Sequence, residues 1–332
     1  MNYAQNTIRP KKIRKGSHIR VIAPSRSLSL LSKETLKDAK KRFQEHGFSL
    51  SFGRHVEEMD EFLSSSVESR VEDLHEAFSD PHVDAILTTI GGYNSNQMLD
   101  FIDYDLIKTH PKIICGFSDI TALANAITAK TGLITYIGPH FSSWAMKYGF
   151  EYSLEKFLDC CASDVAFDLQ PSEKWSDDPW YIDQEKREFI DNEGYWVLNT
   201  GYAFGKTVGG HVRCLNALQG TIYWPGFDDS VILLEEDAEI NPQLFDRQLQ
   251  SLIHQKDFQY VKGILIGRFQ KETKMTRALL EKIIQSKKVL SNLPIVANVD
   301  FGHTTPIATL PVGGSIEMIA ENEKTTIRII EH

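Results

Sequence analysis

Short apolar runs alternate with segments of helical periodicity through the first half of the chain. The apolar runs predict strands at residues 18–24, 49–52, 83–89, 113–115 and 134–137. Apolar positions spaced three or four apart predict helices over residues 33–46, 67–78 and 118–130, and a shorter one near residues 97–102. This alternation is typical of a mostly parallel sheet flanked by helices. It predicts an N-terminal α/β domain over residues 1–165.

The pattern changes between residues 166 and 196. Pro, Ser, Asp and Trp dominate there without a clear period. Structureless stretches of this length are uncommon inside compact domains and often carry function. We therefore expect residues 166–196 to form an aromatic-rich connecting loop.

A looser alternation resumes in the second half. It predicts strands at residues 231–234 and 260–266, a helix that starts at Asn241-Pro242, a helix over residues 275–285, and a closing hairpin at residues 316–320 and 325–330. Residues 197–332 are predicted to form a smaller C-terminal α/β domain with a mixed sheet. The two domains would enclose a cleft.

Composition narrows the range of functions. The chain has 332 residues, enough for two domains, and its 36 Lys and Arg against 45 Asp and Glu give a formal charge of −9. This charge argues against a protein that binds nucleic acid polymers. No apolar run approaches the roughly 18 residues of a membrane span, and no signal-peptide pattern follows the basic N-terminus. The four cysteines lack the spacing of a disulfide framework or a zinc site, which favours the cytoplasm.

The segment around Ser118 carries the clearest candidate chemistry. An apolar strand ends at Gly116, and Ser118 and Asp119 follow as a helix begins. A sharp strand-to-helix turn can display a nucleophilic hydroxyl, and the free N–H groups of the first helical turn can hold an oxyanion. Ile120 stands where a G-x-S-x-G motif has its second glycine, so a simple helix cap is the alternative.

A second glycine turn follows the strand at residues 83–89, at Gly91-Gly92. Its backbone N–H groups would lie at the carboxyl end of a strand, where open α/β sheets bind ligands. An ordinary tight turn explains the two glycines equally well.

Two segments of the second half could supply partners for a nucleophilic serine. Glu235 is the first residue after an apolar run, and His303 lies in a polar loop after the strand-like run at residues 293–299. A serine needs a base to take its proton, and a histidine base needs a carboxylate to fix its tautomer. Glu236 is the main rival for the carboxylate. His140 and His211 are rival histidines because each also follows a glycine-containing strand end.

Taken together, these segments resemble the LD-carboxypeptidase and microcin C immunity protein family of serine peptidases over nearly the whole chain. The motifs that carry the resemblance are Gly91-Gly92-Tyr93-Asn94, Gly116-Phe117-Ser118-Asp119, Gly209-Gly210-His211, Leu234-Glu235 with Asp237 and Glu239, and Gly302-His303-Thr304.

The resemblance implies a catalytic triad of Ser118, His303 and Glu235 in the interdomain cleft. It also implies an oxyanion hole formed by the backbone N–H groups of Gly92 and Asp119. A cytoplasmic homodimer that needs no metal and no cofactor is the further expectation.

Two branches of the family differ in substrate. The murein branch, which releases D-alanine from cytoplasmic tetrapeptides, typically has an arginine before a Gly-Gly-Tyr-Gly motif. This chain has Ile90 and Asn94 at those places, a departure toward the microcin immunity branch, which carries an aromatic-rich insertion. The corresponding stretch here contains Trp175, Trp180, Tyr181 and Trp196.

These aromatic rings could stack on an adenine base, or they could anchor the loop. We expect hydrolysis of an amide bond in a peptidyl or aminoacyl nucleotide of the microcin C type. Trp175, Trp180, Tyr93 and Asn94 are the expected substrate contacts. A murein tetrapeptide is the alternative substrate, and a two-domain module that binds a ligand without chemistry is the alternative of another class.

Overall fold

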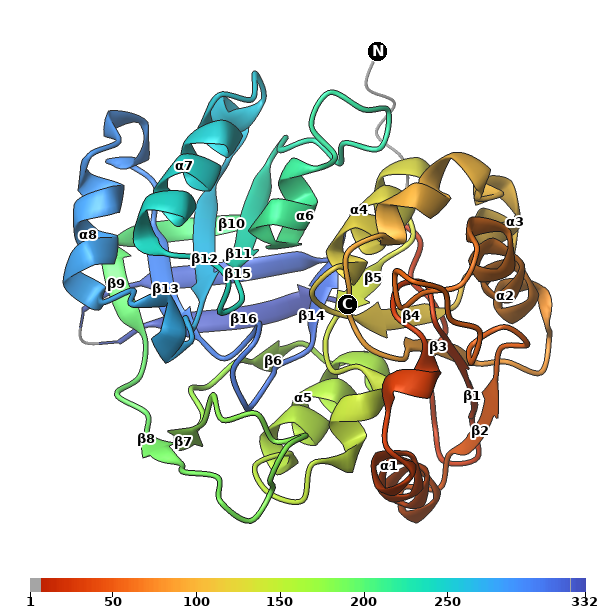
Figure 1. Cartoon of the computed structure of the whole chain (residues 1–332). Coiled ribbons are helices and arrows are strands. Elements are labelled where there is room, and N and C mark those ends of the chain that lie inside the picture. The colour runs from red at the N-terminus through yellow and green to blue at the C-terminus, as the bar shows by residue number, and fades with distance from the viewer. Residues whose placement is uncertain (1–6, 323) are drawn as a thin grey trace.

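The structure, a computed structural model, describes residues 7–322 and 324–332. Two sheets lie side by side, and helices cover them (Figure 1). This arrangement confirms the predicted two-part α/β fold. No helix of the described part of the chain is long and apolar enough to cross a membrane.

The first sheet has six strands in the order β14-β5-β4-β3-β1-β2. Five of them are parallel to one another, as the alternation of strands and helices predicts, and β14 joins the edge antiparallel to β5. The strands are β1 (His18–Ile22), β2 (Ser49–Phe52), β3 (Ala85–Thr88), β4 (Ile113–Gly116), β5 (Thr135–Ile137) and β14 (Leu310–Val312). Because β14 comes from the C-terminal part of the chain, the two parts are interlocked.

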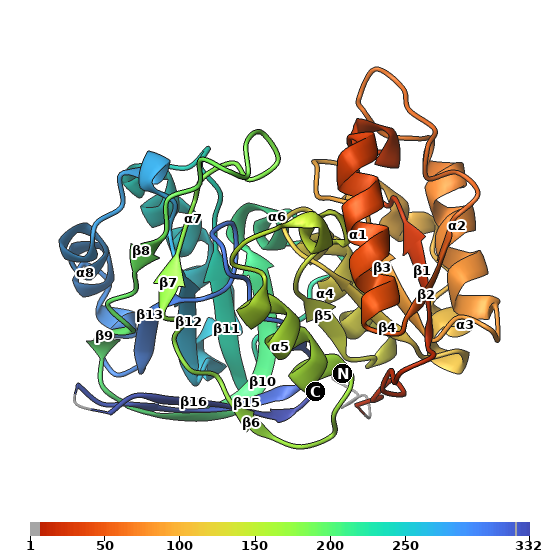
Figure 2. The same ribbon diagram turned by 90° about the horizontal axis from the view of Figure 1, so that it is seen from below.

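Five helices cover this sheet. They are α1 (Lys33–Glu45), α2 (Val67–Ser79), α3 (Tyr104–Thr109), α4 (Ile120–Thr131) and α5 (Glu151–Cys161). α1 and α5 lie on one face of the sheet, and α2, α3 and α4 lie on the other (Figure 2). The apolar residues of each set belong to a separate core cluster. Local signals fix the helix ends: Ser32 Oγ accepts a hydrogen bond from Thr35 N at the start of α1, and Gly132, with φ of +80°, ends α4.

The second sheet has eight strands in the order β6-β16-β15-β10-β11-β12-β13-β9. The strands are β6 (Phe167–Asp168), β9 (Trp196–Asn199), β10 (Gly201–His211), β11 (Ser230–Glu235), β12 (Gly263–Gly267), β13 (Ile295–Val299), β15 (Ser315–Ala320) and β16 (Thr326–Glu331). β10 to β13 are parallel and the outer strands are antiparallel, so the predicted mixed sheet and closing hairpin are confirmed.

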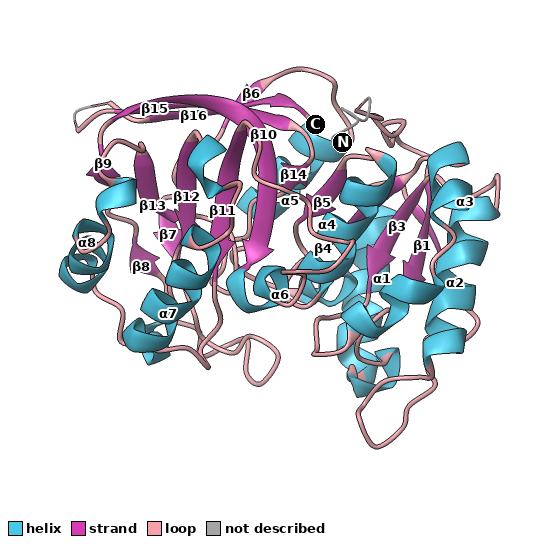
Figure 3. Ribbon diagram, turned by 90° about the horizontal axis from the view of Figure 1, so that it is seen from above, coloured by secondary structure: helices cyan, strands magenta, loops and turns pink. Residues whose placement is uncertain are grey.

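The helices α6 (Val212–Asn216), α7 (Pro242–Ile253) and α8 (Arg277–Gln285) lie along one face of this sheet (Figure 3). Side chains alternate along β11: Ile232 and Leu234 pack toward these helices, whereas Val231 and Leu233 pack on the opposite face. Asn241 Oδ1 caps α7 by accepting from Leu244 N.

The periodicity of the sequence missed several elements. It did not indicate α3, α5, β9 or the long strand β10, whose sequence is rich in glycine. The expected loop at residues 166–196 begins with β6 and reaches the first residue of β9; between these it contains a short two-stranded ribbon, β7 (Lys174–Trp175) and β8 (Ile190–Asp191). The domain boundaries at residues 165 and 197 stay a prediction.

Candidate active site

Ser118 lies at a sharp turn between β4 and α4. Its backbone φ of +62° falls in the left-handed region, which is costly for a residue with a Cβ. Glycines make room for this turn: a Cβ on Gly116 would lie 2.1 Å from Thr88 Oγ1, and a Cβ on Gly91 would lie 2.9 Å from Ser118 Oγ. α4 begins only at Ile120, and the Asp119 side chain makes no capping hydrogen bond, which disfavours the helix-cap alternative.

His303 lies between Ser118 and Glu235. Its Nε2 is 3.1 Å from Ser118 Oγ, and its Nδ1 is 2.7 Å from Glu235 Oε2. Glu235 is the last residue of β11, and its side chain is fully buried. Gly302, with φ of +104°, brings the histidine loop close to this carboxylate, because a Cβ there would lie 2.6 Å from Glu235 Oε2. The three side chains can pass a proton from a serine hydroxyl to an imidazole that a carboxylate stabilises.

The rival carboxylate, Glu236, points elsewhere. Its Oε2 accepts a hydrogen bond from Arg213 Nε at 3.0 Å and lies 3.2 Å from His211 Nε2. Burial raises the pKa of Glu236, although the charges of His211 and Arg213 oppose the shift. The geometry therefore brings Glu235, not Glu236, to His303.

The two predicted oxyanion-hole residues border the serine turn. The Asp119 carboxylate accepts hydrogen bonds from Ser25 Oγ at 2.6 Å and from Ser95 N at 2.8 Å, which ties the turn to the loops after β1 and β3. The Gly92 N–H donates no hydrogen bond to any other residue in the described part of the chain. Gly92 also packs too closely for a side chain, since a Cβ would lie 2.2 Å from Ser25 Oγ.

A cavity of about 700 Å³ opens over Ser118 and His303. Pockets for small molecules occupy roughly 300–1,000 Å³. Residues from loops that follow strands of both sheets, and from the connecting loop, line it. This volume is in the range of a pocket for a small-molecule ligand.

Only some of the expected substrate contacts line this cavity. Tyr93 and Trp180 do, whereas Asn94 and Trp175 are not among the lining residues. The Trp175 ring instead lies under the Arg268 guanidinium, 5.1 Å from its centroid. The backbone carbonyl of Asn94 accepts a hydrogen bond from the Arg70 side chain at 2.9 Å. Trp175 and Asn94 thus make contacts outside the cavity lining, and their role as substrate contacts stays a prediction.

Arg26 and His140 also line the cavity; His140 is one of the rival histidines named from the sequence, whereas Arg26 was not singled out there. Arg26 follows the first strand and His140 follows β5, so both lie beyond the carboxyl ends of parallel strands. The rule that singled out Gly92 would have found Arg26 as well. Burial, reinforced by the charge of His303, lowers the pKa of His140 to about 3.

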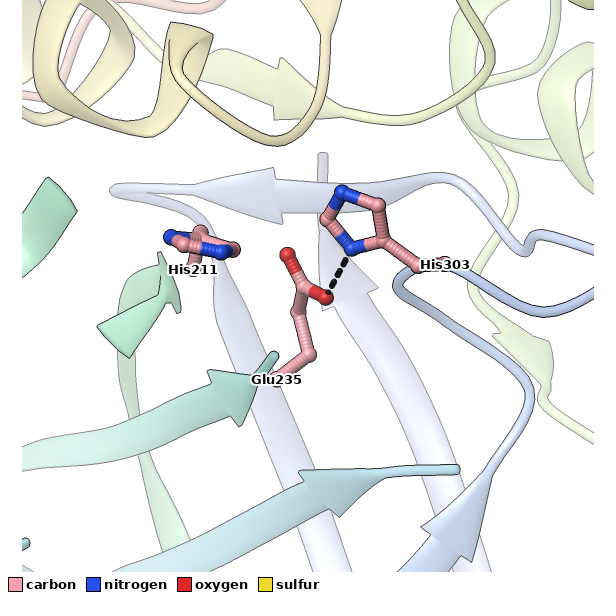
Figure 4. Close-up of side chains that lie close together, drawn as sticks. All are labelled: His211, Glu235 and His303. Atoms are coloured by element: carbon pink, nitrogen blue, oxygen red, sulfur yellow. Dashed lines mark hydrogen bonds and ion pairs between the residues drawn. The ribbon is translucent and has the colours of Figure 1, made fainter. Parts of the chain in front are cut away.

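Two overlapping groups of side chains have donor atoms close enough to share a metal ion. They are His211, Glu235 and His303, shown in Figure 4, and His211, Glu236 and Asp237. To bind a metal, the first group would have to give up the hydrogen bond between His303 and Glu235. The second group would have to give up the contacts between Glu236 and Arg213. Burial favours a neutral His211, but Asp237, Cys214 and Glu235 together raise its pKa well above the usual range. A protonated imidazole has no lone pair for a metal.

Comparison with known protein families gives matches in both halves. Residues 19–138 match the LD-carboxypeptidase N-terminal domain, and residues 204–318 match the LD-carboxypeptidase C-terminal domain. YocD of Bacillus subtilis (strain 168), whose name assigns it to the carboxypeptidases only provisionally, is 51% identical over 97% of this chain and 99% of its own.

Solved structures show the same architecture. The crystal structure of an MccF-like protein from Bacillus anthracis superposes with a TM-score of 0.97 at 52% identity, covering 98% of this chain and 100% of that one. The Microcin C7 self-immunity protein MccF of Escherichia coli is 30% identical over 86% of this chain and 85% of its own. A structure of MccF in complex with aspartyl sulfamoyl adenosine superposes with a TM-score of 0.88 at 26% identity, covering 97% and 98% of the two chains.

Proposed function

We propose, from the premise that this chain belongs to the LD-carboxypeptidase family of serine peptidases, that it hydrolyses an amide bond in a peptidyl or aminoacyl nucleotide. Membership makes the chain a hydrolase of the serine peptidase or carboxypeptidase class. The proposals for the substrate and for the role of each residue rest on one observation. Ser118, His303 and Glu235 are joined by contacts of 3.1 and 2.7 Å at a cavity that contains Trp180.

In the proposed mechanism His303 Nε2 accepts the Ser118 proton while Oγ attacks the substrate carbonyl carbon. The N–H groups of Gly92 and Asp119 stabilise the oxyanion of the tetrahedral intermediate. His303 then donates its proton to the leaving nitrogen, the C–N bond breaks, and an acyl-enzyme remains. A water molecule attacks this ester by the same route, and Ser118 is regenerated.

Glu235 acts through His303. Its carboxylate accepts the Nδ1 hydrogen, which keeps Nε2 free to take the serine proton and stabilises the imidazolium that forms. Full burial excludes water from this contact, so the interaction is little screened.

The preference for a nucleotide is supported by the lining of the cavity and by the neighbours. Trp180 offers an aromatic face, and base stacking on such a ring is worth about 1–3 kcal/mol. MccF itself has been crystallised with aspartyl sulfamoyl adenosine. A murein tetrapeptide remains the alternative because its terminal D-alanine is also released at an amide bond.

Fluorophosphonate labelling followed by product analysis tests the proposal. The wild-type protein should be labelled at Ser118, and Ser118→Ala should lose both labelling and turnover, the latter by at least about 10³-fold. A folded protein that is not labelled, or a Ser118→Ala variant labelled as well as wild type, would count heavily against Ser118 as the nucleophile of a hydrolase.

Mass spectrometry of incubations with aspartyl sulfamoyl adenosine and with a murein tetrapeptide then separates the two substrates. Release of aspartate supports the nucleotide proposal, whereas turnover of the tetrapeptide alone contradicts it. The expected homodimer is checked separately by light scattering after gel filtration, where a monomer mass at micromolar concentration would count against it.

A further inference from the structure

Arg26 occupies a distinctive place in the cavity. It follows β1, and among the described residues that line the cavity it is the only arginine or lysine. It also packs directly on Gly92: a Cβ there would lie 2.9 Å from Arg26 Cγ and 3.3 Å from Arg26 N. Its side chain therefore starts beside one of the two N–H groups proposed to hold the oxyanion.

The carboxylates on the cavity wall are already paired with other groups. Asp237 lies 2.5 Å and Glu239 3.3 Å from guanidinium nitrogens of Arg213. On the other side of the cavity, Asp177 lies 3.3 Å from Lys271 Nζ. These negative charges are matched by cations that stand outside the cavity lining.

The remaining lining carboxylate, that of Asp178, is occupied by local hydrogen bonds. It accepts one from Ser176 Oγ at 3.2 Å and one from the backbone N–H of Glu188 at 2.6 Å. Each of the four carboxylates that line the cavity therefore already has an ion-pair or hydrogen-bond partner within the protein.

Arg26 is different. No carboxylate of the described chain lies within 4.0 Å of its guanidinium, and its buried Nε has no hydrogen-bond partner there. Its guanidinium carbon lies over the ring of Tyr93, 4.9 Å from the ring centroid, and the Tyr93 hydroxyl donates a hydrogen bond to Glu239. Stacking of this kind fixes the plane of a guanidinium and leaves its edge free to donate.

The backbone of Arg26 is also held in place. Its carbonyl accepts a hydrogen bond from Thr89 Oγ1 at 2.9 Å, and it pairs with Ser64 in an isolated antiparallel bridge. A cation whose backbone and side chain are both fixed loses little conformational freedom when it binds an anion.

We propose that Arg26 binds the anionic oxygens of the substrate next to the scissile amide and selects substrates that carry such a group. This inference rests on the proposed function. The guanidinium fork matches both carboxylate and phosphoryl-type oxygens through paired hydrogen bonds. A tetrapeptide presents its terminal carboxylate at this place, and an aminoacyl nucleotide presents its phosphoryl or sulfamoyl oxygens.

Binding of matched anionic and neutral probes tests Arg26 without relying on turnover. Ligand-observed NMR titrations would compare AMP with adenosine, and N-acetyl-D-alanine with its amide. In each pair the charged probe should bind wild type more tightly, by about 10- to 100-fold, the range for a hydrogen bond to a charged group. The AMP pair and the alanine pair show which source of anion the site accepts.

Three variants complete the test. Arg26→Met should abolish the preference for the charged probe, and Arg26→Lys should restore part of it. Arg54→Met is the matched control, because Arg54 is exposed, pairs with Glu72 and Glu76, and lies outside the cavity lining. It should keep the wild-type preference. Thermal unfolding of each variant establishes that it is folded.

The outcomes are decisive in both directions. A preference that survives Arg26→Met, or a wild-type protein that prefers neither charged probe, overturns the role of Arg26. A protein that binds AMP through Arg26 but hydrolyses neither proposed substrate would overturn the proposed function, and only the anion-binding role of Arg26 would stand.

Discussion

His140 should make the stability of this protein depend on pH in a way that can be calculated. The imidazole is buried, stacks on Phe117 with ring centroids 4.2 Å apart, and has its Nδ1 2.8 Å from Thr88 Oγ1. Its Nε2 is also buried and has no partner in the described part of the chain. Burial, together with the nearby charge of His303, lowers the pKa of His140 to about 3 from an ordinary 6.5. Between these two values the unfolded chain binds a proton at this position and the native state does not.

The sign and the size of the effect follow from this difference. Because the unfolded state binds more protons, the free energy of unfolding falls as the pH falls from about 6.5 toward about 3. One pKa unit corresponds to 1.36 kcal/mol, so the loss from this single group is about 2 kcal/mol between pH 7 and pH 5, and about 5 kcal/mol in total. At pH 7 and above, the neutral ring carries almost no penalty.

Substitution by asparagine removes the titration and keeps an amide that can reach Thr88. We expect His140→Asn to be less stable than wild type at pH 7 by about 1–3 kcal/mol, through lost packing. Urea unfolding at pH 7 and at pH 5 should then show a decline that is about 2 kcal/mol smaller in the variant than in wild type. His82→Asn is the control, since His82 is exposed, and it should follow wild type. Equal declines in His140→Asn and wild type, within about 0.5 kcal/mol, would refute the burial argument.

Three further predictions concern the site. Glu235→Gln should lower kcat by about 10²–10⁴-fold, because the wrong tautomer of His303 is then favoured. Glu236→Gln should lower kcat less than about tenfold, and steady-state kinetics that show the reverse order would make Glu236 the catalytic carboxylate. Gly302→Ala should lower the free energy of unfolding in urea by at least about 1 kcal/mol and should abolish most of the activity. The reason is that a φ of +104° is unfavourable for alanine and that its Cβ would meet Glu235 Oε2. A variant with unchanged stability and activity would contradict this close approach. Trp180→Ala should reduce turnover of aspartyl sulfamoyl adenosine far more than turnover of a murein tetrapeptide. Trp175 is outside the cavity lining, so Trp175→Ala should reduce neither rate. Equal losses of both rates in Trp180→Ala would assign Trp180 an anchoring role instead.

Strong local signals allowed much of the fold to be predicted. The caps at Ser32 and Asn241 and the stop at Gly132 lie where the helices begin and end. The weak points were segments whose structure depends on distant neighbours. β10 is held in the sheet by β11 and β15 on either side, and its glycine-rich sequence has no strand periodicity of its own.

The candidate site divides in the same way. Ser118, Glu235 and His303 were chosen by residue type and by their places after apolar strands, and the family resemblance selected them from several possible sets. Sequence reasoning overlooked Arg26 as a cavity residue because a single arginine after a strand is ordinary. Two features of the structure distinguish Arg26: it packs against Gly92, and it has no carboxylate partner in the described part of the chain.

The sequence by itself determined the alternation of strands and helices, the mixed second sheet and the residue types of a serine hydrolase, because these depend on local periodicity and on short motifs. The tertiary structure alone decided which glutamate faces His303, which tryptophan lines the cavity and which cation is left without a partner. Glu235 is the last residue of β11 and Glu236 the first residue after it, yet the Glu235 side chain contacts His303 and the Glu236 side chain contacts Arg213. Such choices depend on contacts between segments far apart in the chain, and these exist only once the two sheets have packed together.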